Sequence, residues 1–182
     1  MKKTLTICSL VVALFLTGCS STINSKNNFA NSVQSQSDFK SKTLQEKRTE
    51  NIENISIDIP SDWKKEVNNN NFYYYTSEDD FLMVQTPEFK YELNDFSFDT
   101  ILDSSTSSMS NINITNKGFS VINSQKFFTA TYTATYSNSD LLVEIYATKV
   151  DSKLYIFAMT CKHQDSKHID IVPEIINSFK TI

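Results

Sequence analysis

Residues 126–136 read KFFTATYTATY, and this pattern sets the fold class. Apolar or aromatic residues at every second position from Phe128 to Tyr136 alternate with four threonines. A period of two is that of a β-strand, in which successive side chains point to opposite faces. The sequence therefore predicts a long strand with one face packed on a core and a threonine face that stays partly in water.

Strand patterns continue on both sides of this stretch, and short polar turns separate the segments. Further strands are predicted at 55–60, 72–76, 81–86, 119–123, 141–150 and 153–162. The first of them ends at a proline, and the next two read as a hairpin. A polar loop is predicted at 68–71.

Two segments change from the strand period to apolar positions that share one face of a helix. The first helix is expected to carry the stripe Phe98, Ile101, Leu102, Met109 and Ile112, with Asp95 or Ser97 as its cap. Its stretch 104–108 weakens it, because serine is a mediocre helix former. The closing helix, which is expected to begin near Asp170, carries Ile169, Val172, Ile175, Ile176 and Phe179.

The connections between the predicted strands are too short for parallel crossovers, so the sheet should be antiparallel. We expect an α+β fold, in which an antiparallel β-sheet of about six or seven strands packs with helices as an α/β/α sandwich. Trp63, the only tryptophan, follows the first of these strands. Continuing the period of that strand places Trp63 in the core, between the strand and the closing helix, rather than at a ligand site.

Three parts of the chain resemble the PsbP-like family. They are 57–63 near the start of the domain, the long strands around Tyr132 and Tyr136, and 175–180 at the end. The resemblance covers nearly all of 51–182 and rests on packing residues rather than catalytic ones. It implies a PsbP-like fold and a non-catalytic domain used for docking or binding, often carried by small exported lipoproteins.

The N-terminus has the layout of a secretory signal peptide. Two lysines precede an apolar run at 5–16, and the exit Leu16-Thr17-Gly18-Cys19 resembles the bacterial lipobox. We expect residues 1–18 to be the lipoprotein signal peptide and Cys19 to be the lipidation site, with a diacylglycerol on its sulfur. Two or more acyl chains anchor a protein stably to a membrane.

Composition divides the rest of the chain into a tether and a domain. Residues 19–50 are expected to be the lipidated N-terminus and a flexible tether, because 17 of the 31 residues after Cys19 are Ser, Asn, Gln or Thr. The domain is expected at 51–182, where ten lysines and eighteen acidic residues give a net charge of −8. This charge disfavours nucleic acid as a partner. We expect an extracytoplasmic protein, lipid-anchored to the cell membrane of a Gram-positive surface.

One cluster near the end of the chain has residue types that bind metals. Cys161 and His163 share a strand face, with Asp165 and His168 just beyond, but this spacing matches no recognised zinc motif. In the alternative, both histidines lie in a solvated loop and Cys161 is a small buried residue. It then continues the face of Tyr155, Phe157 and Met159. We favour the alternative and predict no metal, no cofactor and no catalytic residue.

Acidic and aromatic groups offer two weaker candidates. Glu78-Asp79-Asp80 lacks the alternation and the glycine of a calcium loop, and reads as a solvated hairpin turn. The aromatic stretch 72–75 and the pair Tyr132 and Tyr136 could stack on a sugar or a peptide. Strand alternation buries every second one of them in any case.

These observations favour a membrane-anchored exported lipoprotein with a non-catalytic binding or scaffolding domain. Its expected partners are the membrane, through the lipid on Cys19, and another envelope protein or a wall component. The alternative is an unfamiliar envelope hydrolase or accessory factor acting on cell-wall polymer. A hydrolase would need two carboxylates facing each other at roughly 5–10 Å.

Overall fold

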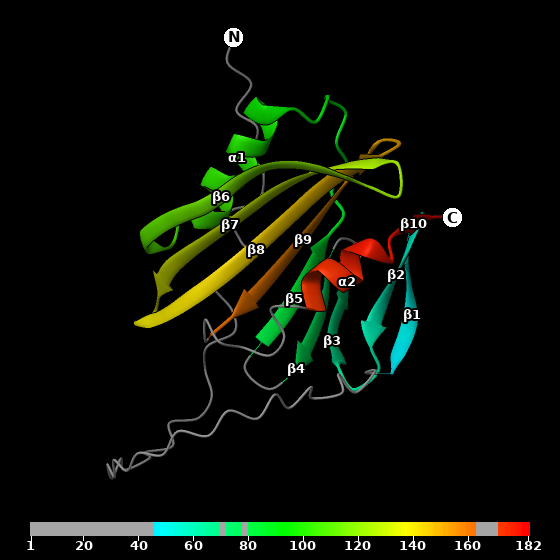
Figure 1. The fold of residues 1–182 in the computed structure, drawn as a ribbon, viewed down its shortest axis with the longest axis horizontal. Helices are drawn as coiled ribbons and strands as arrows, with labels where there is room; N and C mark the ends of the chain where they lie inside the picture. The colour runs from blue at the N-terminus through cyan, green and yellow to red at the C-terminus, as the bar shows by residue number, and fades with distance from the viewer. Residues whose placement is uncertain (1–45, 70–71, 78–79, 163–170) are drawn as a thin grey trace, which may run out of the picture.

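The computed structural model describes residues 46–69, 72–77, 80–162 and 171–182 (Figure 1). A seven-stranded antiparallel sheet dominates, with the order β3-β4-β5-β9-β8-β7-β6. Its strands are β3 (Lys64–Asn69), β4 (Phe72–Ser77), β5 (Asp80–Gln85), β6 (Ser110–Ile122), β7 (Gln125–Tyr136), β8 (Ser139–Val150) and β9 (Lys153–Cys161). A three-stranded sheet is formed by β1 (Lys47–Ile52), β2 (Ile55–Pro60) and β10 (Lys180–Thr181).

One helix lies on each side of the large sheet, so the predicted α+β sandwich is confirmed (Figure 1). The helix α1 (Asp95–Thr106) covers β7 and buries Phe98, Ile101 and Leu102. On this face β7 buries every second residue from Phe128 to Ala134. Its threonines point to the opposite face and are half-buried, as the alternation predicts. No helix among the described residues combines the length and the apolar character needed to cross a membrane.

The second core fills the space between the large sheet, the small sheet and the helix α2 (Ile171–Asn177). The ring of Phe127 meets that of Phe179 edge-on at 5.1 Å between centroids. Trp63 is 1% exposed and belongs to this core, which also holds the isoleucines of β2 and the buried residues of α2. The predicted burial of Trp63 is therefore confirmed.

Two-residue turns that contain no glycine join β6 to β7 and β7 to β8. Asn123 and Ser124 have φ angles of 50° and 66°, and Ser137 and Asn138 have 47° and 66°. Such left-handed pairs match the twist of a hairpin, and asparagine tolerates them better than most residues. The side chain of Asn123 also donates hydrogen bonds to the carbonyls of Asn177 and Phe179 at 2.8 and 3.1 Å, which ties the first hairpin to the end of α2.

Several predicted boundaries are wrong. The tether was expected to end at 50, but β1 begins at Lys47, because its pairing with β2 compensates for a polar sequence. The first helix ends at Thr106, and β6 begins at Ser110, so Met109 and Ile112 are not on the helix. The poor helix formers at 104–108 end it there.

Other local predictions need smaller corrections. The cap of α1 is Asn94, one residue before the predicted Asp95. Its side chain accepts a hydrogen bond from the Ser97 backbone N–H, and the Ser97 hydroxyl accepts one from the Asn94 backbone N–H. The backbone of β3 runs to Asn69, into the predicted polar loop, and β10 was not predicted. The closing helix buries Val172, Ile175 and Ile176 as expected, whereas Ile169 and Asp170 lie outside the described residues.

Candidate functional site

The cysteine and histidine cluster is only partly within the described residues. Cys161 is 2% exposed and shares the core of Tyr155, Phe157 and Met159, so its predicted place on that face is confirmed. His163, Asp165 and His168 lie outside the described residues, as does Cys19. Within the described ranges, no group of three or more His, Cys, Asp or Glu residues could hold a metal ion.

The acidic turn and the aromatic candidates contribute to packing where they are described. Asp80 is buried at the start of β5, opposite Ser77, rather than solvated, and Glu78 and Asp79 lie outside the described residues. Tyr132 is 1% exposed, and the half-buried Tyr136 packs against the same core.

The stretch 72–75 divides its four aromatic side chains between the two cores. Tyr73 and Tyr75 are buried in the core beneath the small sheet. Phe72 and Tyr74 are half-buried, stack with centroids 6.4 Å apart, and pack against the core under α1. These pairs therefore do not form the free aromatic surface that a sugar needs.

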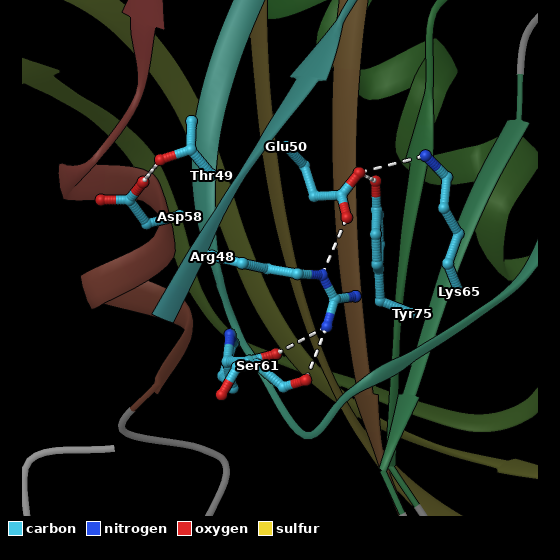
Figure 2. A network of polar contacts seen from close by, with 8 residues as sticks. Arg48, Thr49, Glu50, Asp58, Ser61, Lys65 and Tyr75 are labelled. Carbon is cyan, nitrogen blue, oxygen red and sulfur yellow. Dashed lines mark hydrogen bonds and ion pairs between the residues drawn. The ribbon is translucent and has the colours of Figure 1, made fainter. Parts of the chain in front are cut away.

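A polar network joins β1 to the edge of the large sheet (Figure 2). Glu50 accepts hydrogen bonds from Arg48 at 2.9 Å, from Lys65 at 3.1 Å and from the Tyr75 hydroxyl at 3.5 Å. Arg48 also donates to the carbonyl of Ser61 at 2.8 Å. Figure 2 shows these side chains converging on the Glu50 carboxylate from β1, β3 and β4.

Two cations, Arg48 and Lys65, share the single carboxylate of Glu50 in this network. Burial alone raises the pKa of the Glu50 carboxyl, but hydrogen bonds from Arg48 and Lys65 and their positive charges outweigh it, so the pKa lies below its ordinary value. Burial and the neighbouring Glu50 raise the pKa of the Tyr75 hydroxyl. Both oxygens of Glu50 have partners within the protein, which is typical of a structural clamp rather than a reactive site.

A second cluster ties the turn between β1 and β2 to the large sheet. Glu53, in that turn, forms an ion pair with Lys153 and accepts a hydrogen bond from Thr86 at 3.0 Å. The hydrogen bond to Glu53 raises the pKa of Lys153. Thr86 is fully buried, so this cluster also holds the two sheets together.

The threonine face of β7 continues onto β8 without a close pair of carboxylates. Thr131 pairs with Glu144 and Thr135 with Asp140. Four residues of strand separate the two acids, which places their Cα atoms roughly 13 Å apart. Burial and the nearby Glu144 raise the pKa of Tyr146 on this face to about 12, so its hydroxyl is protonated at neutral pH. This arrangement does not supply the facing carboxylates of a glycoside hydrolase.

The largest group of exposed apolar side chains in the described part of the chain lies on β6. Ile112, Ile114, Phe119 and Val121 are 42%, 47%, 62% and 66% exposed. Every residue of β6 from Ser110 to Phe119 is exposed, and β7 is its only neighbour in the sheet order. An edge strand presents unpaired backbone donors and acceptors, to which another extended chain can add. We call the outer side of β6 the β6 edge.

The region beside the β6 edge combines aromatic rings with lysines. Phe119 pairs with Phe128 across the strands, and their ring centroids are 6.4 Å apart. The ammonium of Lys126 lies 4.2 Å from the centroid of Phe119 and 4.5 Å from that of Phe128. Lys117 forms an ion pair with Asp99 of α1. Strands β6 and β7 together carry these two lysines and no acidic residue.

The other end of the large sheet differs. Strand β3 has only six residues, begins with Lys64, Lys65 and Glu66, and has an irregular register with β4. Short length, charges and bulges are the features by which natural sheets protect their edges. Strand β6 is longer, and over Lys117–Ile122 its register with β7 is regular and Lys117 is the single charged residue. The β6 edge is therefore the best candidate binding surface among the described residues, and no local pattern in the sequence marks it.

No protein-family model matches the sequence, and no curated protein matches it closely enough to count as a relative. The structure is similar to the solution structure of cyanobacterial PsbP (CyanoP) from Synechocystis sp. PCC 6803, with a TM-score of 0.59 over 78% of this chain and 96% of that chain, at 11% identity. It is also similar to a point mutant of protein Mog1, with a TM-score of 0.57 over 75% of this chain and 96% of that one, at 6% identity.

A third solved structure, from Bacteroides thetaiotaomicron, gives a TM-score of 0.52 at 9% identity and covers 71% of this chain but 45% of that chain. At these identities the likeness shows the fold alone. The chain therefore has a PsbP-like fold, as its packing residues predict.

Proposed function

We propose that this chain is a membrane-anchored exported lipoprotein whose PsbP-like domain binds or scaffolds a partner and catalyses no reaction. The observation that carries the proposal is the β6 edge. A monomeric soluble domain rarely leaves open a long edge strand with several exposed apolar side chains, and contiguous exposed apolar surface marks interaction sites. The expected partner is another envelope protein or a wall component.

The ionisable groups support binding rather than catalysis. In the described network around Glu50 and the cluster around Glu53, each carboxylate is paired with lysine or arginine where the two sheets meet. The acids Asp140 and Glu144 on the threonine face lie too far apart along β8 for the hydrolase alternative. Such groups stabilise the scaffold that presents the edge.

The anchor part of the proposal rests on the sequence around Cys19. Residues 20–45 separate it from the first described residue, which allows the domain to stand off the bilayer. Metabolic labelling with a fatty acid tests this part. We expect Cys19→Ala to remove the label, because this is the cysteine that follows the lipobox. Persistent label on that variant would contradict the assignment.

The binding part is tested in intact cells with a photo-activatable phenylalanine analogue. Placed at Phe119, on the β6 edge, the analogue should give discrete cross-linked adducts of the lipoprotein. Placed at Ile182, which is similarly exposed at 68% but belongs to the other end of the fold, it should give none. No adduct from position 119, or the same adducts from both positions, would contradict a binding role for the β6 edge.

A further inference from the structure

We propose that the β6 edge binds the β6 edge of a second copy of this chain, so that two seven-stranded sheets join antiparallel across a two-fold axis. The inference rests on the proposed binding function and names the first partner of the same surface. A two-fold pairing is self-complementary, because each copy offers the same strand to the other.

The backbone of β6 suits this pairing in one half of the strand. Register shifts occur between Ser110 and Asn113 and between Ile114 and Asn116, and such bulges hinder the addition of another strand. From Lys117 to Ile122 the register with β7 is continuous. This segment therefore presents a regular row of outward backbone groups, long enough for a short antiparallel ladder.

The side chains of β6 fit a copy of the same strand better than a highly charged partner. Lys117 is the only charged residue of β6, and Asp99 of the same copy already neutralises it. The rest of the strand is neutral, so two copies meet with little like-charge repulsion although residues 51–182 carry −8 overall. A strongly acidic or basic segment would find no matching row of charges on this strand.

A two-fold axis normal to the sheet also brings like faces together. Phe119 pairs with Phe128 and Val121 with Lys126, so both apolar residues lie on the face that α1 covers. In the dimer this face stays on the same side of the joined sheet in both copies. Phe119 and Val121 of one copy then lie beside those of the other, and their exposed fractions of 62% and 66% fall on pairing.

The interface is small. An aromatic side chain buries roughly 150–250 Å² when fully covered, whereas a standard interface buries about 800 Å² per partner. The dimer should therefore be weak in solution, with a dissociation constant on the order of tens of micromolar. Confinement of both copies to one membrane would raise their effective concentration and favour it.

Sedimentation equilibrium of residues 20–182 tests the pairing, since this chain keeps every described residue and omits Cys19. We expect the apparent mass to rise from one to two copies over roughly 1–500 µM. Gly118→Lys should weaken dimerisation at least about tenfold, because it adds a charged side chain of each copy to the ladder, where the two-fold axis brings like charges together. A Cβ at Gly118 meets nothing within 4 Å, so the fold should tolerate the change.

Two further variants define the surface. Phe119→Lys should weaken the dimer to a similar degree, and thermal melting should show that each variant is folded. Ile182→Lys is the matched control, with an exposed aliphatic residue changed away from β6, and should leave the dissociation constant unchanged. If Gly118→Lys does not fold, Phe119→Lys carries the test.

A monomer at every concentration would overturn the proposal, as would a dimer that both β6 variants leave intact. These failures are distinguishable from failure of the binding function. A monomeric chain whose Phe119 position still cross-links to a different protein in cells keeps the binding role and loses only the self-pairing. Adducts of twice the chain mass support it.

Discussion

Arg48→Met should destabilise the domain far more than a neighbouring charge removal on the same strand. Arg48 donates hydrogen bonds to Glu50 at 2.9 Å and to the carbonyl of Ser61 at 2.8 Å, and the side chain of Glu50 is 17% exposed. Hydrogen bonds to charged groups contribute roughly 1.5–3 kcal/mol when buried, and half-burial reduces this. We expect Arg48→Met to lower the free energy of unfolding by about 2 kcal/mol, which corresponds to a fall of roughly 6–10 °C in Tm.

Lys47→Met is the matched control. Lys47 forms an exposed ion pair with Glu174 at 2.9 Å, with both side chains more than a third exposed. Such a pair contributes less than about 0.5 kcal/mol. Urea denaturation and thermal melting of both variants at neutral pH measure the difference. Equal losses for Arg48→Met and Lys47→Met would refute the view that the Glu50 network holds the two sheets together.

The same network should respond to pH with a defined sign. The pKa of Glu50 is lower in the folded protein than in the unfolded chain, whose ordinary value is 4.5. Its contribution to stability is therefore fully present above pH 4.5 and is lost as the pH falls through the folded pKa. In Glu50→Gln this part of the acid destabilisation should be missing. Parallel pH profiles for the variant and the parent chain would contradict the assigned charge interactions.

Three further changes test the fold. Trp63→Ala should lower the free energy of unfolding by roughly 3–5 kcal/mol, because the indole is 1% exposed. The tryptophan emission of the parent protein should be blue-shifted and resist quenchers, and quenching in the folded state would contradict burial. A chain that starts at residue 46 should have the same Tm as one that starts at residue 20. A chain that starts at residue 51 lacks most of β1, and its Tm should fall at least as much as that of Arg48→Met. Lys153→Met should lower the free energy of unfolding by about 1–3 kcal/mol, because it leaves Glu53 without its cation. An unchanged denaturation midpoint would show that this ion pair contributes nothing to stability.

The large sheet could be predicted because its strands carry a clean period of two. Along β7 the apolar and threonine positions alternate without interruption, so both its extent and its buried face follow from the sequence. Strand β1 gives no such signal, because Arg48 and Glu50 occupy the positions that face the large sheet. These charges are tolerated there only because they pair with each other and with Lys65, which lies distant in the sequence.

The start of β6 was assigned to a helix for a related reason. Met109 and Ile112 extend the helical stripe of Phe98, Ile101 and Leu102 by spacing alone. Pairing with β7 decides against that stripe, and Ser110 already lies opposite Thr135. Spacing within a segment carries no information about a strand that pairs with it later in the chain.

The β6 edge itself could not be predicted from local sequence. Alternation shows that a strand has an exposed face, but not whether it lies at the edge of a sheet. That position follows from the order of all seven strands, in which β9 is inserted between β5 and β8. The predicted lipidation of Cys19 is the opposite case, because the lipobox-like pattern on which it rests is local and needs no fold.

Hydrogen–deuterium exchange of the protein in cell membranes, held there by the proposed lipid on Cys19, tests most directly whether the β6 edge binds a partner. We expect the amides in Lys117–Ile122 that point away from β7 to exchange at least about tenfold more slowly in the membrane than in dilute purified protein, because a partner strand covers the β6 edge there. Amides of β3, at the protected edge of the same sheet, should exchange at equal rates in both samples. Equal rates for Lys117–Ile122 in the two samples would contradict the claim that this edge is a binding surface.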